Sequence, residues 1–173
     1  SAIEREENAR RIAVGALRYF LLKFTRGTII AFEFEDAVSF EGETGPYCLY
    51  AIVRARSIWR KALEASGGEA GAQVSGDAAG KFLAGADDIW DVVMTASSLG
   101  AQIETAISAQ EPAFLAKYAF QLAQAFNLFY HKHRILSEED AAKKAFLLSL
   151  TSMVEKQLVA ALRLLGIEAP EEM

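Results

Sequence analysis

The feature that most constrains the fold is a long apolar repeat near the end of the chain. Its members are spaced three or four residues apart: Leu147, Leu150, Val154, Leu158, Ala161 and Leu165. Because an α-helix turns once every 3.6 residues, this spacing places them on one face of a helix. Gly166 follows, and glycine is common just beyond a helix end. The repeat therefore predicts a long helix ending at Leu165, with one face buried against other parts of the chain.

Four earlier segments also have helical spacing. Helices are predicted over residues 4–24, 46–65 and 87–109, and from Pro112 through an apolar stripe at Leu115, Tyr118, Leu122, Ala125, Phe126 and Phe129. Gly100 either breaks the third of these helices or allows close packing of a neighbouring element. We therefore expect an all-α fold, a helical bundle of five or six helices.

Residues suited to helix ends flank these segments. They are Gly27 after the first helix, Thr44 with Pro46 before the second, Asp87 or Asp88 before the third, and Ser137 with Asp140 before the last. Ser, Thr and Asp side chains accept hydrogen bonds from the free N–H groups at a helix start. Proline at the first helical position has no N–H group to leave unpaired.

Two segments have no helical pattern. Residues 28–34, with the sequence TIIAFEF, are β-branched and aromatic, which is typical of a short strand or of a buried extended connection. Residues 66–85 are rich in Gly, Ala and Ser, so we expect a flexible surface loop there.

The composition, with 52% hydrophobic and 24% charged residues, is that of a globular protein. No uninterrupted apolar run is long enough to cross a bilayer, so we expect no membrane partner. Cys48 is the one cysteine, which excludes an internal disulfide and favours a reducing compartment such as the cytoplasm. The chain begins at Ser1, as expected either of a piece of a longer polypeptide or of a protein whose initiator Met was removed.

We predict no catalytic centre and no metal site. His131 and His133 are two residues apart and point to different faces of a helix, so this spacing cannot bring them to one metal ion. The three acids of residues 32–36, FEFED, are interpreted as a solvated acidic turn rather than an acid–base or metal site. Cys48 has no evident base beside it and is interpreted as a packing residue.

The helix over residues 46–65 carries an unusual stripe. At about 100° per residue, Tyr47, Tyr50, Arg54 and Lys61 fall within about 80° of its circumference. Unpaired bases stack on aromatic rings, and an arginine fork binds phosphate or a base edge, so the stripe is suited to a single-stranded RNA loop. The alternative is that the tyrosines only cover the edge of the core with their hydroxyl groups in water. Arg56 lies on the opposite, apolar side, where it would either extend toward water or form a buried ion pair.

Four blocks, in order along the chain, resemble the C-terminal part of arginyl-tRNA synthetases. They are RIAVGALRYFLLK (11–23), SFEGETGPYCLYAIVRARSIWRKA (39–62), YAFQLAQAFNLFYHKHRIL (118–136) and LVAALRLLGIEAPEEM (158–173). By these four blocks the chain resembles the anticodon-binding, DALR-type domain of these class I enzymes. The resemblance implies that residues 1–40 end a catalytic or stem-contacting region and that residues 41–173 form the anticodon-binding bundle.

The resemblance also implies a parent enzyme that joins arginine to tRNA(Arg) with ATP and Mg. The His-x-Gly-His and Lys-Met-Ser-Lys-Ser motifs of the ATP site are not in this chain, so the active site and any cofactor are expected in a catalytic domain of the same polypeptide. The partners implied are the anticodon loop of tRNA(Arg) and that domain, and no DNA.

Residues implied to bind tRNA by this resemblance are Tyr47, Tyr50, Arg54, Tyr130, Arg134 and Met173. Two positions depart from the family pattern. Leu49 stands where relatives often have Gln, and Glu172 stands where a basic residue often precedes the final Met. The second change puts the contribution of the tail to RNA affinity in doubt.

The net charge of −5 argues against a nucleic-acid partner, but the acids gather at both ends of the chain and within residues 33–43. Lys132 with Arg134, and Lys143 with Lys144, form separate basic clusters that suit either phosphate contact or a solvated face. Two other functions stay open from the sequence: a helical protein-interaction module, and a free-standing paralogue of the anticodon domain.

Overall fold

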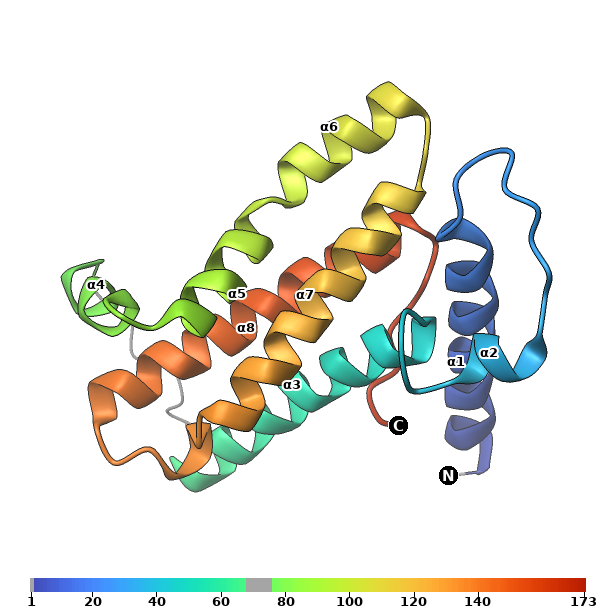
Figure 1. The fold of residues 1–173 in the computed structure, drawn as a ribbon. Helices are drawn as coiled ribbons and strands as arrows, with labels where there is room; N and C mark the ends of the chain where they lie inside the picture. Colours follow the sequence, from blue (N-terminus) through green and yellow to red (C-terminus); the bar gives the residue numbers. More distant parts are fainter. Residues whose placement is uncertain (1, 68–75) are drawn as a thin grey trace.

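The computed structural model describes the backbone of residues 2–67 and 76–173, and the side chains of residues 4–67 and 79–173. This part of the chain is helical and contains no strand, which confirms the all-α prediction. Its elements are α1 (Ala2–Leu22), α2 (Phe34–Val38), α3 (Gly45–Ala65), α4 (Gly76–Leu83), α5 (Asp87–Ser97), α6 (Leu99–Ala109), α7 (Ala113–Lys132), η1 (Ile135–Ser137) and α8 (Ala141–Leu164). Figure 1 shows that three long helices, α3, α7 and α8, lie alongside one another, with α5 and α6 following one edge.

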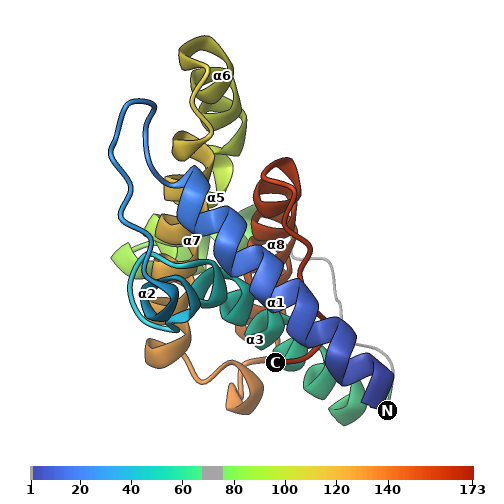
Figure 2. The same cartoon turned by 90° about the vertical axis from the view of Figure 1, so that its right-hand side faces the viewer.

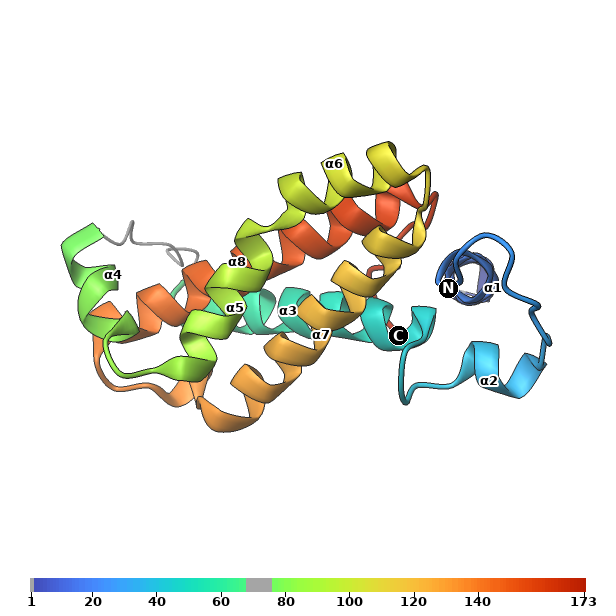
Figure 3. The ribbon, with the colours of Figure 1, turned by 45° about the horizontal axis from the view of Figure 1, so that its top comes forward.

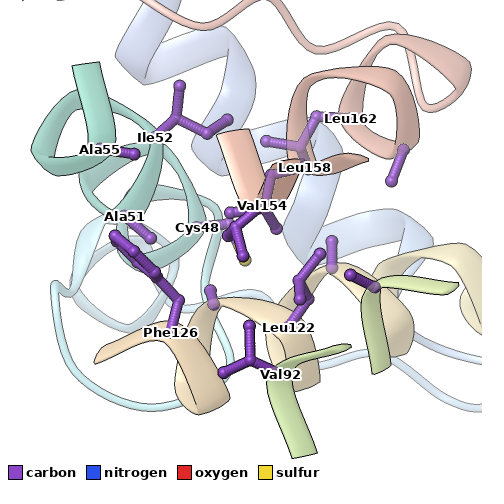
Figure 4. Packing of buried hydrophobic residues seen from close by; sticks show 14 of the residues in the cluster. Cys48, Ala51, Ile52, Ala55, Val92, Leu122, Phe126, Val154, Leu158 and Leu162 are labelled. Atoms are coloured by element: carbon purple, nitrogen blue, oxygen red, sulfur yellow. The ribbon is translucent and has the colours of Figure 1, made fainter. Parts of the chain in front are cut away.

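The core forms where α3, α5, α7 and α8 meet. Their facing side chains are fully buried and apolar, among them Ile52, Val92, Leu122, Phe126, Val154 and Leu158. Figure 4 shows these residues converging from the four helices, with Cys48 between them. The apolar repeat of α8 supplies one side of this core, as its spacing predicts.

α1 crosses one end of the bundle, where Figures 2 and 3 show it set at an angle to the other helices. Two glycines let α1 and α3 approach closely. A Cβ atom on Gly45 would lie 2.7 Å from the carbonyl oxygen of Gly15, and one on Gly15 would lie 3.0 Å from Leu49. The contact is therefore between backbones, and α1 is also held by the buried ring of Tyr19.

Two predicted helix ends are confirmed. The backbone N–H of Tyr47 donates to the side-chain oxygen of Thr44 (3.3 Å), so Thr44 begins α3 as the preceding turn cluster indicates. Gly166 follows α8 with a positive φ of 70°, and the next N–H, of Ile167, donates to the carbonyl oxygen of Leu162 (2.9 Å). Glycine adopts this left-handed conformation without the strain that a Cβ atom would cause.

Other helix-end predictions are wrong. Asp87 and Asp88 lie inside the first turn of α5, which starts after Ala86 without a side-chain cap. Asp140 begins α8 by itself, accepting hydrogen bonds from the N–H groups of the next helical residues, while Ser137 belongs to η1. The break between α5 and α6 falls at Ser98, and a Cβ atom on Gly100 would meet open space. In each case several nearby residues are suited to a helix end, and the sequence does not show which of them the helix uses.

The two segments without a helical pattern also differ from their predictions. Residues 28–33 are neither strand nor buried connection: they have no regular structure, and Ile29 is 97% exposed. α2 follows them and was not predicted. Within the predicted loop 66–85, α4 occupies Gly76–Leu83, and residues 68–75 lie outside the described part of the chain. These two short helices, and the division of 87–109, raise the described α-helices to eight.

α8 is the one helix of the described residues that is long and apolar enough to cross a bilayer by length and composition. Half of its most apolar 18-residue window is buried inside the bundle. It packs against α3, α5 and α7, so its apolar character is that of a core helix.

Candidate nucleic-acid interface

Arg54 lies between two tyrosine rings that come from different helices. Its guanidinium carbon is 4.7 Å from the centre of the Tyr50 ring, on α3, and 4.8 Å from the centre of the Tyr130 ring, on α7. One guanidinium nitrogen, Nη1, donates a 2.6 Å hydrogen bond to the side-chain oxygen of Asn127, one turn before Tyr130. Cation–π attraction and this bond together fix the plane of the guanidinium group.

The three stacked side chains are open to solvent on one side. Tyr50 is 42% exposed and Tyr130 is 38% exposed, while Arg54 between them is half-buried. Phe40 extends the surface, because its ring meets Tyr50 edge to face at 6.4 Å and is itself exposed. We call Phe40, Tyr50, Arg54 and Tyr130 the aromatic–arginine surface.

Tyr47 is not part of this surface. Its ring is half-buried, packs on Phe120 with ring centres 5.5 Å apart, and covers the edge of the core. The interpretation of a core-covering tyrosine therefore describes Tyr47, whereas Tyr50 stands in solvent. Lys61, further along the stripe, is exposed, but Ile58, which lies between Arg54 and Lys61, is buried.

Met173 and Arg134 lie at the margins. Met173 is 40% exposed and lines a groove of about 380 Å³ with Val53 and Ser57, which neighbour Tyr50 and Arg54 on α3. Arg134 is exposed, but α7 has ended by Lys132, so helical spacing no longer places it beside Tyr130.

Phe40 and Asn127 were missed by the sequence analysis. Phe40 precedes the turn that leads into α3, and nothing in its local pattern marks it as a partner of Tyr50. Asn127 lies one turn before Tyr130 on α7, so a search for polar residues on the Tyr130 face would have found it.

Arg56, which had two interpretations, forms an ion pair. Its Nε donates to a carboxylate oxygen of Glu155 on α8 (3.0 Å), and both side chains are about three-quarters buried. Its Nη1 donates to the carbonyl oxygen of Pro170 and to Glu171 in the C-terminal tail. A guanidinium on the apolar side of α3 is thus bonded to α8 through Nε and to the C-terminal tail through Nη1.

Cys48 and the acids of residues 32–36 lie in surroundings that do not suit catalysis or metal binding. Burial raises the pKa of the Cys48 thiol to about 12, so it stays protonated and unreactive at neutral pH, as expected of a packing residue. Glu33, Glu35 and Asp36 are exposed, which fits a solvated acidic segment, although the last two lie in a helix rather than a turn. Across residues 4–67 and 79–173, no group of three His, Cys, Asp or Glu side chains is placed to hold a metal ion.

His133 contacts an acid rather than a second histidine. Its Nε2 lies 2.7 Å from a carboxylate oxygen of Asp88, which joins the end of α7 to the start of α5. Burial would raise the pKa of Asp88, but the hydrogen bond and charge of His133, with a smaller contribution from Lys132, hold it below its ordinary value. The pair fixes the C-terminal end of the helix that carries Tyr130.

A model of the DALR anticodon binding domain matches residues 48–173, which is most of the chain. The chain belongs to the DALR anticodon binding domain family. The match begins inside α3 and includes Tyr50, Arg54, Tyr130 and Met173.

Relatives of this DALR domain are named arginine–tRNA ligases. The arginine–tRNA ligase of Maricaulis maris is 39% identical over 173 residues, and that of Latilactobacillus sakei is 40% identical over 169 residues. These alignments cover 100% and 98% of the DALR domain but 28% of each relative. The chain therefore spans little more than a quarter of the length of the curated relatives it matches.

Solved structures give the same result for the fold. Thermus thermophilus arginyl-tRNA synthetase superposes on the DALR domain with a TM-score of 0.80 at 31% sequence identity, covering 97% of this chain and 28% of that one. The Plasmodium falciparum enzyme superposes with a TM-score of 0.73 at 22% identity, covering 94% and 27%, and supports the fold alone. The predicted resemblance to the C-terminal part of arginyl-tRNA synthetases is confirmed.

Proposed function

We propose that this DALR domain binds the anticodon loop of tRNA(Arg) through its aromatic–arginine surface. The observation that carries the proposal is the Arg54 guanidinium held between Tyr50 and Tyr130, with both rings partly exposed. Fixing exposed side chains costs rotamer entropy, so a surface arranged before RNA binds loses less affinity to this cost. Here the order is supplied in advance by Asn127 and by the packing of α3 on α7.

The chemistry of the surface suits an unpaired loop. Each exposed ring offers a face on which a base can stack, which contributes about 1–3 kcal/mol per base. A guanidinium group has five N–H donors, and Asn127 accepts from one nitrogen, so the remaining donors are available to a phosphate or a base edge. Any type of base can stack on these rings, which gives affinity, and the arginine fork beside them adds some selectivity.

The charge distribution supports a modest affinity for the domain alone. Lys61 on α3, Lys132 at the end of α7 and Arg134 after it are exposed, and Lys132 also lies 3.9 Å from a carboxylate oxygen of Asp88. The other basic cluster has local partners: Lys143 pairs with Glu138 at 2.7 Å, and Lys144 donates to the carbonyl oxygen of Leu136. With a net charge of −5 and few phosphate contacts, binding of the domain alone should be weak.

The outer face of α1 is suited to pack against the further part that the longer relatives contain. Val14, Leu17 and Leu21 form an exposed apolar stripe on the outer face of this helix, each more than 40% exposed. We assign the stripe to packing against a catalytic part of the same polypeptide, in which ATP and Mg would drive the joining of arginine to tRNA(Arg) in the cytoplasm. Residues 1–40 would then belong to the junction with that part, and residues 41–173 to the anticodon-binding bundle.

An exposed apolar stripe would also serve a protein-interaction module. The family match favours RNA binding instead, because it covers most of the bundle and includes Tyr50, Arg54 and Tyr130 but not α1. A free-standing paralogue would leave the α1 stripe in water, where a patch of this kind promotes association. The assignment to an intramolecular contact accounts for the stripe without a second partner.

Titration of the anticodon stem–loop of tRNA(Arg) and of a non-cognate stem–loop tests the proposal. Tyr50→Ala removes a stacking face and should weaken cognate binding by about tenfold or more, whereas Tyr50→Phe keeps the ring and should bind nearly as well as the wild type. Ile107→Ala, an exposed apolar change on α6, is the control for surface truncation. Equal binding of both RNAs by the wild type and Tyr50→Ala would refute the function.

A further inference from the structure

The residues after α8 form a C-terminal tail, residues 165–173, that returns across α3. Gly166 reverses the chain, and Ile167 and Pro170 are buried, which attaches the first half of the tail to the bundle. The last three residues, Glu171, Glu172 and Met173, are exposed and have no apolar anchor as deep as these. Something other than burial must therefore hold the end of the tail near α3.

Arg56 supplies the central contact. Through Nη1 it donates to the carbonyl oxygen of Pro170 at 2.9 Å and to the carboxylate of Glu171 at 3.1 Å. Its Nε is already fixed by Glu155 on α8 at 3.0 Å, so the guanidinium plane is set by the bundle before the tail binds to it. Arg56 is 25% exposed, which makes these bonds stronger than those of a surface pair.

The neighbouring ion pair of the tail is weaker. Arg60 and Glu172 meet at 3.0 Å, but both side chains are more than half exposed, so solvent screens their attraction. Arg11 and Glu168 are 3.9 Å apart, and Glu168 is also exposed. Glu171 is also 77% exposed, so what distinguishes Arg56 is its own burial, its bond to Glu155 and its bond to the carbonyl oxygen of the buried Pro170.

We propose that Arg56 is a positioning residue that holds Met173 against α3 beside the aromatic–arginine surface, so that the end of the chain forms one wall of the RNA site. Met173, Val53 and Ser57 line one groove, and Ser57 is one turn from Arg54 on the same side of α3. The inference rests on the proposed function. It also gives Glu171 a role as an acceptor for Arg56, and it explains how an acidic tail can lie beside an RNA site: Glu171 and Glu172 both face arginines of the protein itself.

The test compares Arg56→Lys with the wild-type chain. Lysine keeps a positive charge near Glu155, so the bundle should stay folded, but it has no fork to hold Glu155 and the tail together. Hydrogen exchange of the amides in residues 167–173 should speed up, and affinity for the tRNA(Arg) anticodon stem–loop should fall by about tenfold, equivalent to 1.4 kcal/mol. Glu168→Gln changes one charge of the same tail away from Arg56 and should alter neither measurement.

A double-mutant cycle separates positioning from a general structural effect. If Arg56 acts through Met173, then Arg56→Lys should cause no further loss of RNA affinity in a chain that already carries Met173→Ala. An equal loss in both backgrounds, or an unchanged exchange rate in the tail, would overturn the role of Arg56. A loss for Tyr50→Ala without a loss for Arg56→Lys would overturn this role alone, whereas no loss for Tyr50→Ala would overturn the proposed function and this role with it.

Discussion

The hydroxyl group of Tyr19 donates a 2.8 Å hydrogen bond to the backbone carbonyl oxygen of Ala116, which joins α1 to α7 inside the protein. Both residues are fully buried, and burial raises the pKa of the Tyr19 hydroxyl far above its ordinary value, so it is a protonated donor at neutral pH. This bond attaches the first helix of the chain to the helix that carries Tyr130.

Replacing Tyr19 with Phe should lower the free energy of unfolding by about 1–2 kcal/mol, because a buried bond is lost while the ring still fills its place. Urea denaturation followed by circular dichroism measures the change. Tyr118→Phe is a comparison, since its hydroxyl also donates to a carbonyl oxygen, of Ala96, but at 3.1 Å between helices nearer in sequence. A Tyr19→Phe protein as stable as the wild type would show that the bond contributes nothing net.

Gly45→Ala should destabilise the protein by about 1–3 kcal/mol, because the new methyl group would meet the backbone of α1 at Gly15 and force the two helices apart. Gly100→Ala is the matched control. It lies in α6, where a Cβ atom meets open space, and alanine there should stabilise the helix by about 0.5 kcal/mol. Thermal unfolding of the two variants should shift in opposite directions. A shift in the same direction would contradict the close approach of α1 and α3.

Arg54→Lys should reduce affinity for the anticodon stem–loop by about tenfold while leaving the overall charge unchanged. A lysine ammonium can lie over one tyrosine ring, but it cannot stack between two rings and donate a fork at the same time. The measurement is binding at several salt concentrations. The slope of affinity against salt should stay the same, since the number of positive charges is unchanged. An affinity equal to that of the wild type would indicate that Arg54 acts only as a point charge.

Stability should depend on the Asp88–His133 pair in the acid range. Because the pKa of Asp88 is lowered in the folded protein, the unfolded chain binds more protons as the pH falls, and stability drops with it. The contribution of Asp88 is complete above about pH 5 and is lost through about pH 4 and below. Asp88→Asn should therefore lower stability at neutral pH and flatten this part of the pH profile.

Asp87→Asn is the control for the Asp88 prediction. Asp87 is exposed in the same first turn of α5, so its removal changes the helix-end charge by the same amount without touching His133. Urea unfolding at pH 7 and at pH 3 should show a pH-dependent difference for Asp88→Asn that is larger than for Asp87→Asn. Identical profiles for the two variants would assign the effect to the helix end instead.

The sequence predicted well the long helices and those helix ends at which a single residue carries the signal. Thr44 and Gly166 mark helix ends by their own chemistry, and the apolar repeat of α8 follows directly from helical periodicity. The short helices α2 and α4 could not be predicted in this way, because helices of this length are held by tertiary contacts and not by their intrinsic propensity.

The candidate site shows the same division. Helical spacing placed Tyr50 and Arg54 together on one face of α3, but it treated Tyr47 as their equal. Which tyrosine is covered depends on Phe120, and which ring completes the stack depends on how α7 lies against α3. Those contacts join residues far apart in sequence, so periodicity within one helix cannot reveal them.

The backbone contact between Gly15 and Gly45 has a mechanical consequence. Interlocking side chains can exchange rotamers and allow two helices to slide, but two main chains in direct contact leave no such freedom. The close crossing of α1 and α3 therefore sets the direction of α1 relative to Tyr50 and Arg54. An RNA bound at its loop by Tyr50 and Arg54 would therefore have the rest of its length held in one direction relative to α1.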